Sequence, residues 1–392
     1  LMDRLNQYTT ALIPQVAYRF LKEGSDQAGI LLIASILTLK FGATATGQFI
    51  PVYLILQFIL QLSLFGFHTH VQEHLQHEGD RFIVWNNAVK ARTSILYLSI
   101  LTLLIIRFNS PFVIPAAVWL IARFYNEIIS LSARYNGKTK EALLIQWIFI
   151  VAIGVWINAE SNSFSLTNFI TTMAIAECGR IAIQLLFRLT YFRLPLIPRI
   201  DFTQLYTAIP HLGTRLLYIL PLNITLLAAI LFLPSGQLTI YTLEICFLVL
   251  GTLPAFALWS TERYRPNALS TDAIVISSLR LTMPGTIISV LWILSTHFLI
   301  NIITGRETEP WVIVPQFIIL LTVYYQLPWL SAFQRLKETS SLRVLLSITL
   351  FIELTLSIVL LSQGEVLTNY MAISGLLFLN TIAIRLLANK IL

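Results

Sequence analysis

Residues 68–78, HTHVQEHLQHE, hold four of the chain's six histidines and two glutamates. On a helix, four of these side chains would share one face: His70, Glu73, His74 and His77. Imidazole and carboxylate groups in that arrangement are ligands that Zn²⁺ accepts. The milder interpretation is an interfacial helix whose histidines titrate near neutral pH beside anionic lipid headgroups. Because the other two histidines lie in apolar segments, no further ligand is indicated, and we predict no metal or other cofactor.

A second group of ionisable residues lies in or beside long apolar stretches, where a charge is costly and is often functional. Near the chain start, four of them are spaced as one helical stripe: Arg19, Lys22, Glu23 and Asp26. The stripe either lies on the cytoplasmic membrane surface or lines a hydrated cavity. We prefer the cavity, because the apolar run 28–41 alone is too short to cross a bilayer.

Two further pairs of opposite charges stand at helical spacing. Arg123 and Glu127 are four residues apart, and Glu177 and Arg180 are three apart. Each pair is expected to share a helix face, where it forms a structural ion pair or contributes to a binding site. Arg215 has no acidic neighbour in its own stretch, so it needs a partner from elsewhere or an anionic ligand.

Together these basic side chains predict a cationic cavity in the membrane for a large anionic substrate, because guanidinium groups suit phosphate and carboxylate. The predicted substrate-binding residues are Arg19, Lys22, Arg123, Arg180 and Arg215. The acidic candidates for ion coupling are Glu23, Asp26, Glu127, Glu177 and Glu244. His297 and Glu353 are also isolated in apolar stretches, where each either couples ions or stays neutral.

The elements that must position these residues are membrane-spanning helices. Hydrophobic residues make up 56% of the chain and charged residues 11%, against about 25% in soluble domains. The two cysteines lie in apolar segments and indicate no disulfide framework. We predict twelve spans, at 14–40, 45–67, 86–106, 111–133, 141–159, 166–188, 205–233, 238–259, 274–303, 310–332, 342–361 and 366–388. The short connections disfavour an enzyme with a large external domain.

The basic residues predict the orientation. Eighteen of the 26 lie at the termini or in loops that join an even-numbered span to the next odd one: Arg4, Arg81, Lys90, Arg92, Arg134, Lys138, Lys140, Arg188, Arg193, Arg199, Arg263, Arg265, Arg280, Arg335, Lys337, Arg343, Arg385 and Lys390. The opposite loops hold Lys40, Arg107 and Arg306. By the positive-inside rule, both termini are expected on the cytoplasmic side. LMDRLNQYTT has no apolar core with a cleavage site, so we expect no cleaved signal peptide.

Two pairs of segments suggest an internal repeat. YNEIISLSARYNGK (125–138) and YYQLPWLSAFQRLK (324–337) share a tyrosine, Leu-Ser-Ala and a lysine at an offset of 199. The stretch 3–19 likewise resembles 201–215. Both pairs divide the chain into six plus six helices, as in repeat transporters with a substrate site between the halves. The predicted fold is an all-α membrane protein with two six-helix lobes around a central cavity, 1–195 and 196–392.

The whole chain resembles the O-antigen type of polysaccharide flippase in the multidrug/oligosaccharidyl-lipid/polysaccharide exporter superfamily. The motifs that carry the resemblance are FGATATGQF (41–49), LSARYNGK (131–138), AIPHLGTRLLYILPLNITLL (208–227) and LINIITG (299–305). The chain departs from the family pattern at Phe41, where leucine is usual, and at Asn223, where many relatives have aspartate. Asn223 therefore joins the ion-coupling candidates and leaves H⁺ or Na⁺ coupling open.

The resemblance implies a transporter, not an enzyme, that moves an undecaprenyl-pyrophosphate-linked oligosaccharide from the cytoplasmic to the periplasmic leaflet of the bacterial inner membrane. The expected partners are this lipid-linked substrate, membrane lipids, a polysaccharide polymerase and a chain-length regulator, with no nucleic acid. Two alternatives remain: a proton- or sodium-coupled drug antiporter of the same superfamily, and a polytopic membrane transferase.

Overall fold

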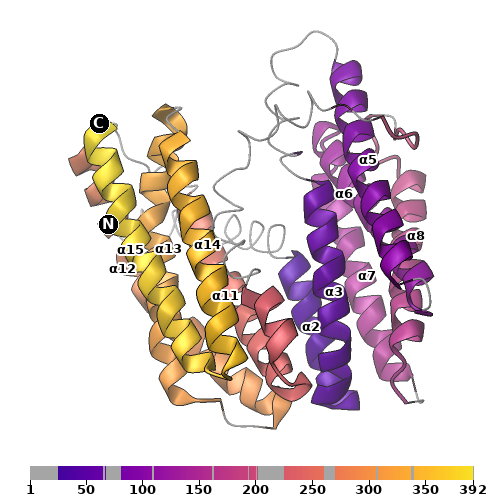
Figure 1. Ribbon diagram of the computed structural model, residues 1–392. Coiled ribbons are helices and arrows are strands. Elements are labelled where there is room, and N and C mark those ends of the chain that lie inside the picture. The colour runs from indigo at the N-terminus through magenta and orange to yellow at the C-terminus, as the bar shows by residue number, and fades with distance from the viewer. Residues whose placement is uncertain are drawn as a thin grey trace, which may run out of the picture. The chain divides into compact units, whose positions relative to one another are not determined.

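The structure, a computed structural model of the chain, describes residues 25–64, 67, 81–107, 110–160, 163–192, 194–199, 201, 225–259, 270–305, 308–336 and 340–391. Within these ranges the chain forms helices joined by short connections, and no strand is present (Figure 1). The all-α fold class is therefore confirmed for the described residues.

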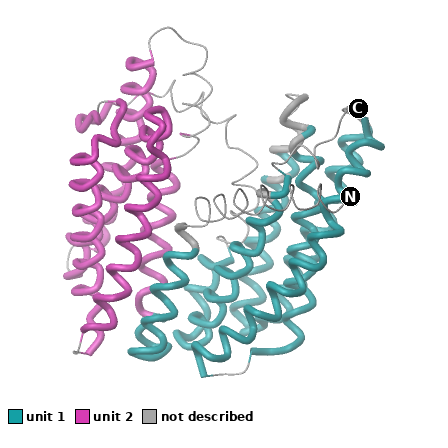
Figure 2. The backbone as a smooth tube through the Cα atoms, turned by 180° about the vertical axis from the view of Figure 1, so that it is seen from behind, with its two compact units in different colours: residues 1–47, 214–392 teal, residues 48–213 magenta. Residues whose placement is uncertain are grey.

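Two compact units make up the chain, and Figure 2 colours them separately. Unit 2 comprises residues 48–213 and holds five described helices, namely most of α3 (Ala43–Ser63), with α5 (Arg81–Arg107), α6 (Val113–Tyr135), α7 (Thr139–Ala159) and α8 (Leu166–Leu186). Helix α6 packs against α5, α7 and α8, and is buried along most of its length. It is therefore the helix best placed to hold polar groups away from lipid.

Unit 1 comprises residues 1–47 and 214–392. Its described elements are α2 (Ser25–Phe41), α11 (Ser235–Trp259), α12 (Thr271–Thr304), the 3₁₀ turn η3 (Pro310–Val312), α13 (Ile313–Leu336), α14 (Ser340–Ser362) and α15 (Val366–Ile391). Helix α13 packs against α11, α12 and α15. Helix α2 packs against α11 and α12, so the first described helix belongs with the C-terminal helices. These units divide the chain differently from the predicted lobes 1–195 and 196–392, and the internal repeat stays a prediction.

The described helices have the length and composition of membrane spans. Nine of them can cross a bilayer by these criteria: Ala43–Ser63, Arg81–Arg107, Val113–Tyr135, Thr139–Ala159, Leu166–Leu186, Ser235–Ala255, Thr271–Thr304, Pro310–Leu330 and Val366–Asn389. The apolar parts of α2 and α14 are shorter, Ala28–Phe41 and Ser347–Ser362. Every predicted span overlaps described helical residues, although for 205–233 these are only 225–232 and the rest of that span lies outside the described ranges. The chain is thus a multi-pass membrane protein, while the arrangement of twelve helices stays a prediction.

The distribution of side chains is the reverse of that in a water-soluble protein. Large apolar side chains face outward, and Ile105, Met283 and Phe351 are each more than 70% exposed. Asn126 and Gln184, in contrast, are fully buried inside unit 2. Outer faces of this kind suit contact with lipid, while polar side chains in the interior join helices through hydrogen bonds.

Capping residues define the two ends of the long helix α12, and a close contact defines how it packs against α13. It begins after Ser270, whose hydroxyl accepts a hydrogen bond from the Ala273 N–H at 3.4 Å. It ends at Gly305, whose φ of 63° is a left-handed conformation that glycine adopts without steric cost. Midway, Gly285 faces the ring of Tyr324 on α13, and a Cβ at this glycine would lie 2.6 Å from that ring. A small residue is therefore required where α12 and α13 pack.

Candidate functional site

The centre of unit 2 holds the charged residues of two neighbouring helices. Helix α6 presents four polar side chains at spacings i, i+3, i+4 and i+7, which place them on one face: Arg123, Asn126, Glu127 and Ser130. Helix α8 packs against α6 and contributes Glu177 and Arg180. Arg123 stands ten residues after the first residue of α6, about 15 Å along the helix at 1.5 Å per residue. These side chains therefore meet near the middle of the membrane span.

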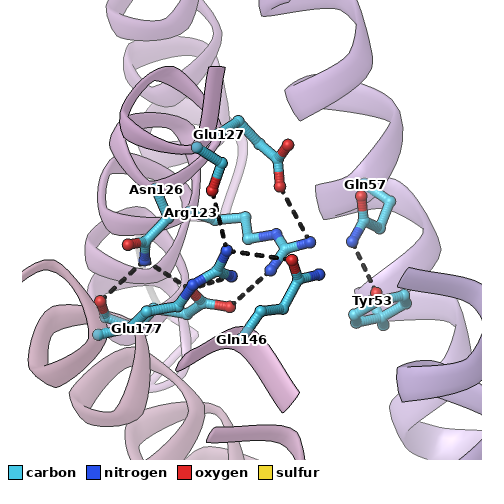
Figure 3. Close-up of polar contacts among 9 residues, drawn as sticks. Tyr53, Gln57, Arg123, Asn126, Glu127, Gln146 and Glu177 are labelled. Atoms are coloured by element: carbon cyan, nitrogen blue, oxygen red, sulfur yellow. Dashed lines mark hydrogen bonds and ion pairs between the residues drawn. The ribbon is translucent and has the colours of Figure 1, made fainter. Parts of the chain in front are cut away.

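Arg123 lies between two carboxylates (Figure 3). Its Nη2 is 3.1 Å from Glu127 Oε1, and its Nη1 is 3.0 Å from Glu177 Oε1. The Arg123 side chain is only 7% exposed, so water screens these interactions weakly. The predicted pair within α6 is thus present, and a second pair joins α6 to α8.

Glu177 is the branching point of the network. Its Oε2 accepts a 2.6 Å hydrogen bond from Asn126 Nδ2 and lies 3.5 Å from Arg180 Nη1. Arg180 also donates from Nη2 to Ser130 Oγ and to Gln146 Oε1 on α7, each at 3.3 Å. One carboxylate thereby connects two arginines, and three helices contribute to the arrangement.

The network is electrically balanced, because its two guanidinium groups face two carboxylates. Exposure is uneven, however: the side chains of Arg180 and Glu177 are 1% and 12% exposed, whereas that of Glu127 is 20% exposed. Glu127 is therefore the member most accessible for exchange with another anion. In Figure 3, Tyr53 and Gln57 lie on a separate helix beside this edge and are joined by a 2.6 Å hydrogen bond.

Of the predicted substrate-binding residues, the structure brings Arg123 and Arg180 together. Five other predicted site residues lie outside the described residues: Arg19, Lys22, Glu23, Arg215 and Asn223. The backbone of Asp26 belongs to α2, and its side chain is not described. The histidine run 68–78 also falls outside the described ranges. Within those ranges, no group of three or more His, Cys, Asp or Glu side chains could hold a metal ion.

The remaining predicted residue, Glu244, belongs to unit 1. It lies on α11, is 4% exposed, and accepts a 2.9 Å hydrogen bond from the Tyr370 hydroxyl on α15. Two other ionisable residues of this unit are also buried: Glu353 on α14 is 1% exposed and His297 on α12 is 6% exposed. Neither oxygen of the Glu353 carboxyl has a hydrogen-bond partner among the described residues. Unit 1 therefore contains two buried carboxyl groups in different polar surroundings.

Three neutral members of the unit 2 network, Asn126, Ser130 and Gln146, were not predicted as site residues. Asn126 and Ser130 stand three and seven residues after Arg123, and this spacing predicts that all three side chains lie on one face of α6. Gln146 is a polar residue in the middle of an apolar stretch. Its position suggests that it has a polar partner, but it does not indicate that the partner is Arg180.

No protein-family model, no curated protein and no solved structure matches this chain. The residues and their geometry, together with the resemblance in motifs, are therefore the basis for inferring a function.

Proposed function

We propose that the protein is a transporter that moves an undecaprenyl-pyrophosphate-linked oligosaccharide across the bacterial inner membrane by alternating access, with both termini in the cytoplasm. The observation that carries the proposal is the buried network around Arg123. A polar network of four charges at membrane depth is costly to maintain, and such residues commonly mark substrate or ion pathways. The motif resemblance and the basic loops support the same function.

The geometry supports a specific role for Arg123 in substrate binding. Without substrate, Glu127 and Glu177 compensate its charge. Glu127 is the more exposed of the two, so a pyrophosphate oxygen replaces its carboxylate beside the guanidinium while Glu177 keeps the side chain oriented. This exchange avoids leaving a buried arginine without an anion in the empty transporter, since such a charge would be strongly destabilising.

The test is export of surface polysaccharide in cells that depend on this protein. The double variant Arg123→Gln with Glu127→Gln stays charge-balanced, so it is expected to fold and reach the membrane but to lose most of the export. The single variant Glu127→Gln retains Arg123 and is expected to retain export. Normal export by the double variant would overturn the role of Arg123. The cationic cavity fails as a whole if single alanine substitutions of Arg19, Arg123, Arg180 and Arg215 all leave export intact.

The buried carboxyl groups of unit 1 favour one other candidate function, a proton- or sodium-coupled antiporter for small molecules. Glu244 and Glu353 are anionic when deprotonated and would suit a cationic substrate or a coupling ion. Transporters of these two kinds export different substrates. A small-molecule antiporter would confer drug resistance on a susceptible strain and leave the surface polysaccharide unchanged when deleted.

A further inference from the structure

A set of polar side chains lies at one end of unit 1. This end holds the C-terminus of α12, the turn η3 with the start of α13, and the starts of α11 and α15. The loops here are those expected on the periplasmic side. The side chains form two hydrogen-bonded groups, one that contains Thr308, in the connection between α12 and η3, and one that contains Glu244 on α11. Both are independent of the charged network in unit 2.

His297 belongs to the first group. Its Nδ1 lies 2.7 Å from Thr308 Oγ1, and its Nε2 lies 3.1 Å from Gln316 Oε1 on α13. Because an amide oxygen only accepts, Nε2 carries the proton and donates to Gln316. A neutral imidazole then accepts from the Thr308 hydroxyl at Nδ1, whereas a protonated imidazole donates to the same oxygen. Both charge states are therefore hydrogen-bonded without movement of the helices.

Glu244 belongs to the second group. Tyr370 on α15 is fully buried and donates its hydroxyl proton to Glu244 Oε2 at 2.9 Å. The Gln316 side chain lies near the Tyr370 hydroxyl, but its Nε2 has no hydrogen-bond partner among the described residues, so the two groups are neighbours without a hydrogen bond between them. A protonated Glu244 can donate to the Tyr370 oxygen in place of accepting from it. Like His297, this carboxyl is supported in both of its protonation states.

The groups around Glu244 provide no cation in the described part of the chain. On its own helix, Tyr241 lies nearby and accepts a 2.9 Å hydrogen bond from Asn369 of α15. Two further carboxyl groups belong to the surroundings, Glu309 in the loop before η3 and Glu353 on α14. Among the described residues no Lys or Arg forms an ion pair with Glu244. Glu244 therefore lies among hydroxyl, amide and carboxyl groups, with no described cation paired to it.

We propose that Glu244 and His297 form a proton-binding centre at the end of unit 1 predicted to face the periplasm, where Tyr370 bonds the carboxyl and Thr308 and Gln316 bond the imidazole. Its role in transport rests on the proposed function, for which it identifies H⁺ as the coupling ion. Each site takes up one proton: Glu244 passes from carboxylate to carboxylic acid, and His297 from imidazole to imidazolium. The centre favours H⁺ over Na⁺ because imidazole is not an oxygen ligand, and the Thr308, Gln316 and Tyr370 side chains already bond the imidazole and the carboxyl.

The proposal is tested on the purified full-length protein in nanodiscs, without any lipid-linked substrate. Infrared difference spectra recorded across a pH titration report the carbonyl band of a carboxyl group that becomes protonated. We expect this band to be lost in Glu244→Gln and retained in the matched variant Glu353→Gln, which removes a buried carboxyl with no hydrogen-bond partner within the described ranges. Proton uptake measured with an indicator dye should fall by one proton per molecule in Glu244→Gln and in His297→Gln.

Two further measurements test the contact of Glu244 with Tyr370 and the preference of the centre for H⁺ over Na⁺. In Tyr370→Phe, which retains the charge and most of the volume, the midpoint pH of the carboxyl band should shift, because the hydroxyl that contacts Glu244 is gone. Addition of NaCl in place of KCl at constant pH should leave the band unchanged. Persistence of the full band in Glu244→Gln, or its loss on addition of Na⁺ alone, would overturn the proposal. Neither result depends on polysaccharide export, so failure of this centre and failure of the flippase function are distinguishable.

Discussion

The substitution Glu177→Gln tests whether the unit 2 network depends on charge balance. Glu177 Oε1 is 3.0 Å from Arg123 Nη1, and its Oε2 is 3.5 Å from Arg180 Nη1. Glutamine keeps the shape of the side chain and its contact with Asn126, but it removes the negative charge. Two buried guanidinium groups would then face Glu127 alone, which leaves one uncompensated positive charge between α6 and α8.

The expected cost follows from the burial of the arginines. Removal of one partner from a buried ion pair costs roughly 3–5 kcal/mol, because the other charge remains without compensation. Glu127 still pairs with Arg123, so we expect the lower end, about 3 kcal/mol, or roughly a 100-fold change in the folded-to-unfolded ratio. Glu127→Gln is the matched control, with the same substitution in the more exposed partner. It should cost only about 1 kcal/mol.

The assay is reversible unfolding of the purified protein by SDS in mixed micelles, which reports differences in the free energy of unfolding. Glu177→Gln combined with Arg180→Gln restores neutrality, so the pair should be about 2 kcal/mol more stable than the sum of the single effects predicts. If Glu177→Gln unfolds at the wild-type SDS concentration, or the double variant is merely additive, the charge-balance argument is refuted.

Two further predictions concern packing and use the same unfolding assay. Gly285→Ala should destabilise by about 1–3 kcal/mol, because its Cβ would lie 2.6 Å from the Tyr324 ring. The same change at Gly375, where no atom lies within 4 Å, should stabilise by about 0.5–1 kcal/mol; equal effects would contradict the close packing. Ser132→Ala should cost about 1–3 kcal/mol, because the hydroxyl accepts from two backbone N–H groups after α8. Ser94→Ala should leave the free energy of unfolding nearly unchanged, since that hydroxyl only donates to the Lys90 carbonyl one turn earlier in α5. A similar loss of stability in both serine variants would refute the stabilising role of the Ser132 hydroxyl.

The helices and the local charge pairs could be predicted from the sequence. Long apolar runs require helices in a bilayer, because each backbone polar group must be satisfied within its own segment. Spacing alone likewise placed Arg123 beside Glu127 and Glu177 beside Arg180, and the ion pairs confirm both placements. Such contacts lie within one helix, where geometry follows directly from position in the chain.

The contacts between helices could not be predicted in the same way. Arg123 and Glu177 are 54 residues apart, and their 3.0 Å contact depends on how α6 and α8 pack. The bonds of His297 to Gln316 and of Glu244 to Tyr370 likewise join helices through neutral side chains, for which the sequence carries no distinctive spacing. Helix packing in membranes depends on shape and on hydrogen bonds between helices, and hydrophobic periodicity provides little information about either.

The neutrality of the unit 2 network changes how its arginines should be tested. A single change at Arg123 removes a ligand for an anionic substrate, but it also leaves Glu127 and Glu177 as partly buried carboxylates with a reduced share of positive charge. Loss of export after that change could then follow from misfolding alone. Paired removal of Arg123 and Glu127 restores the balance and isolates the contribution of the guanidinium to transport. Charge-balanced pairs are therefore the variants that distinguish substrate binding from structural support at this site.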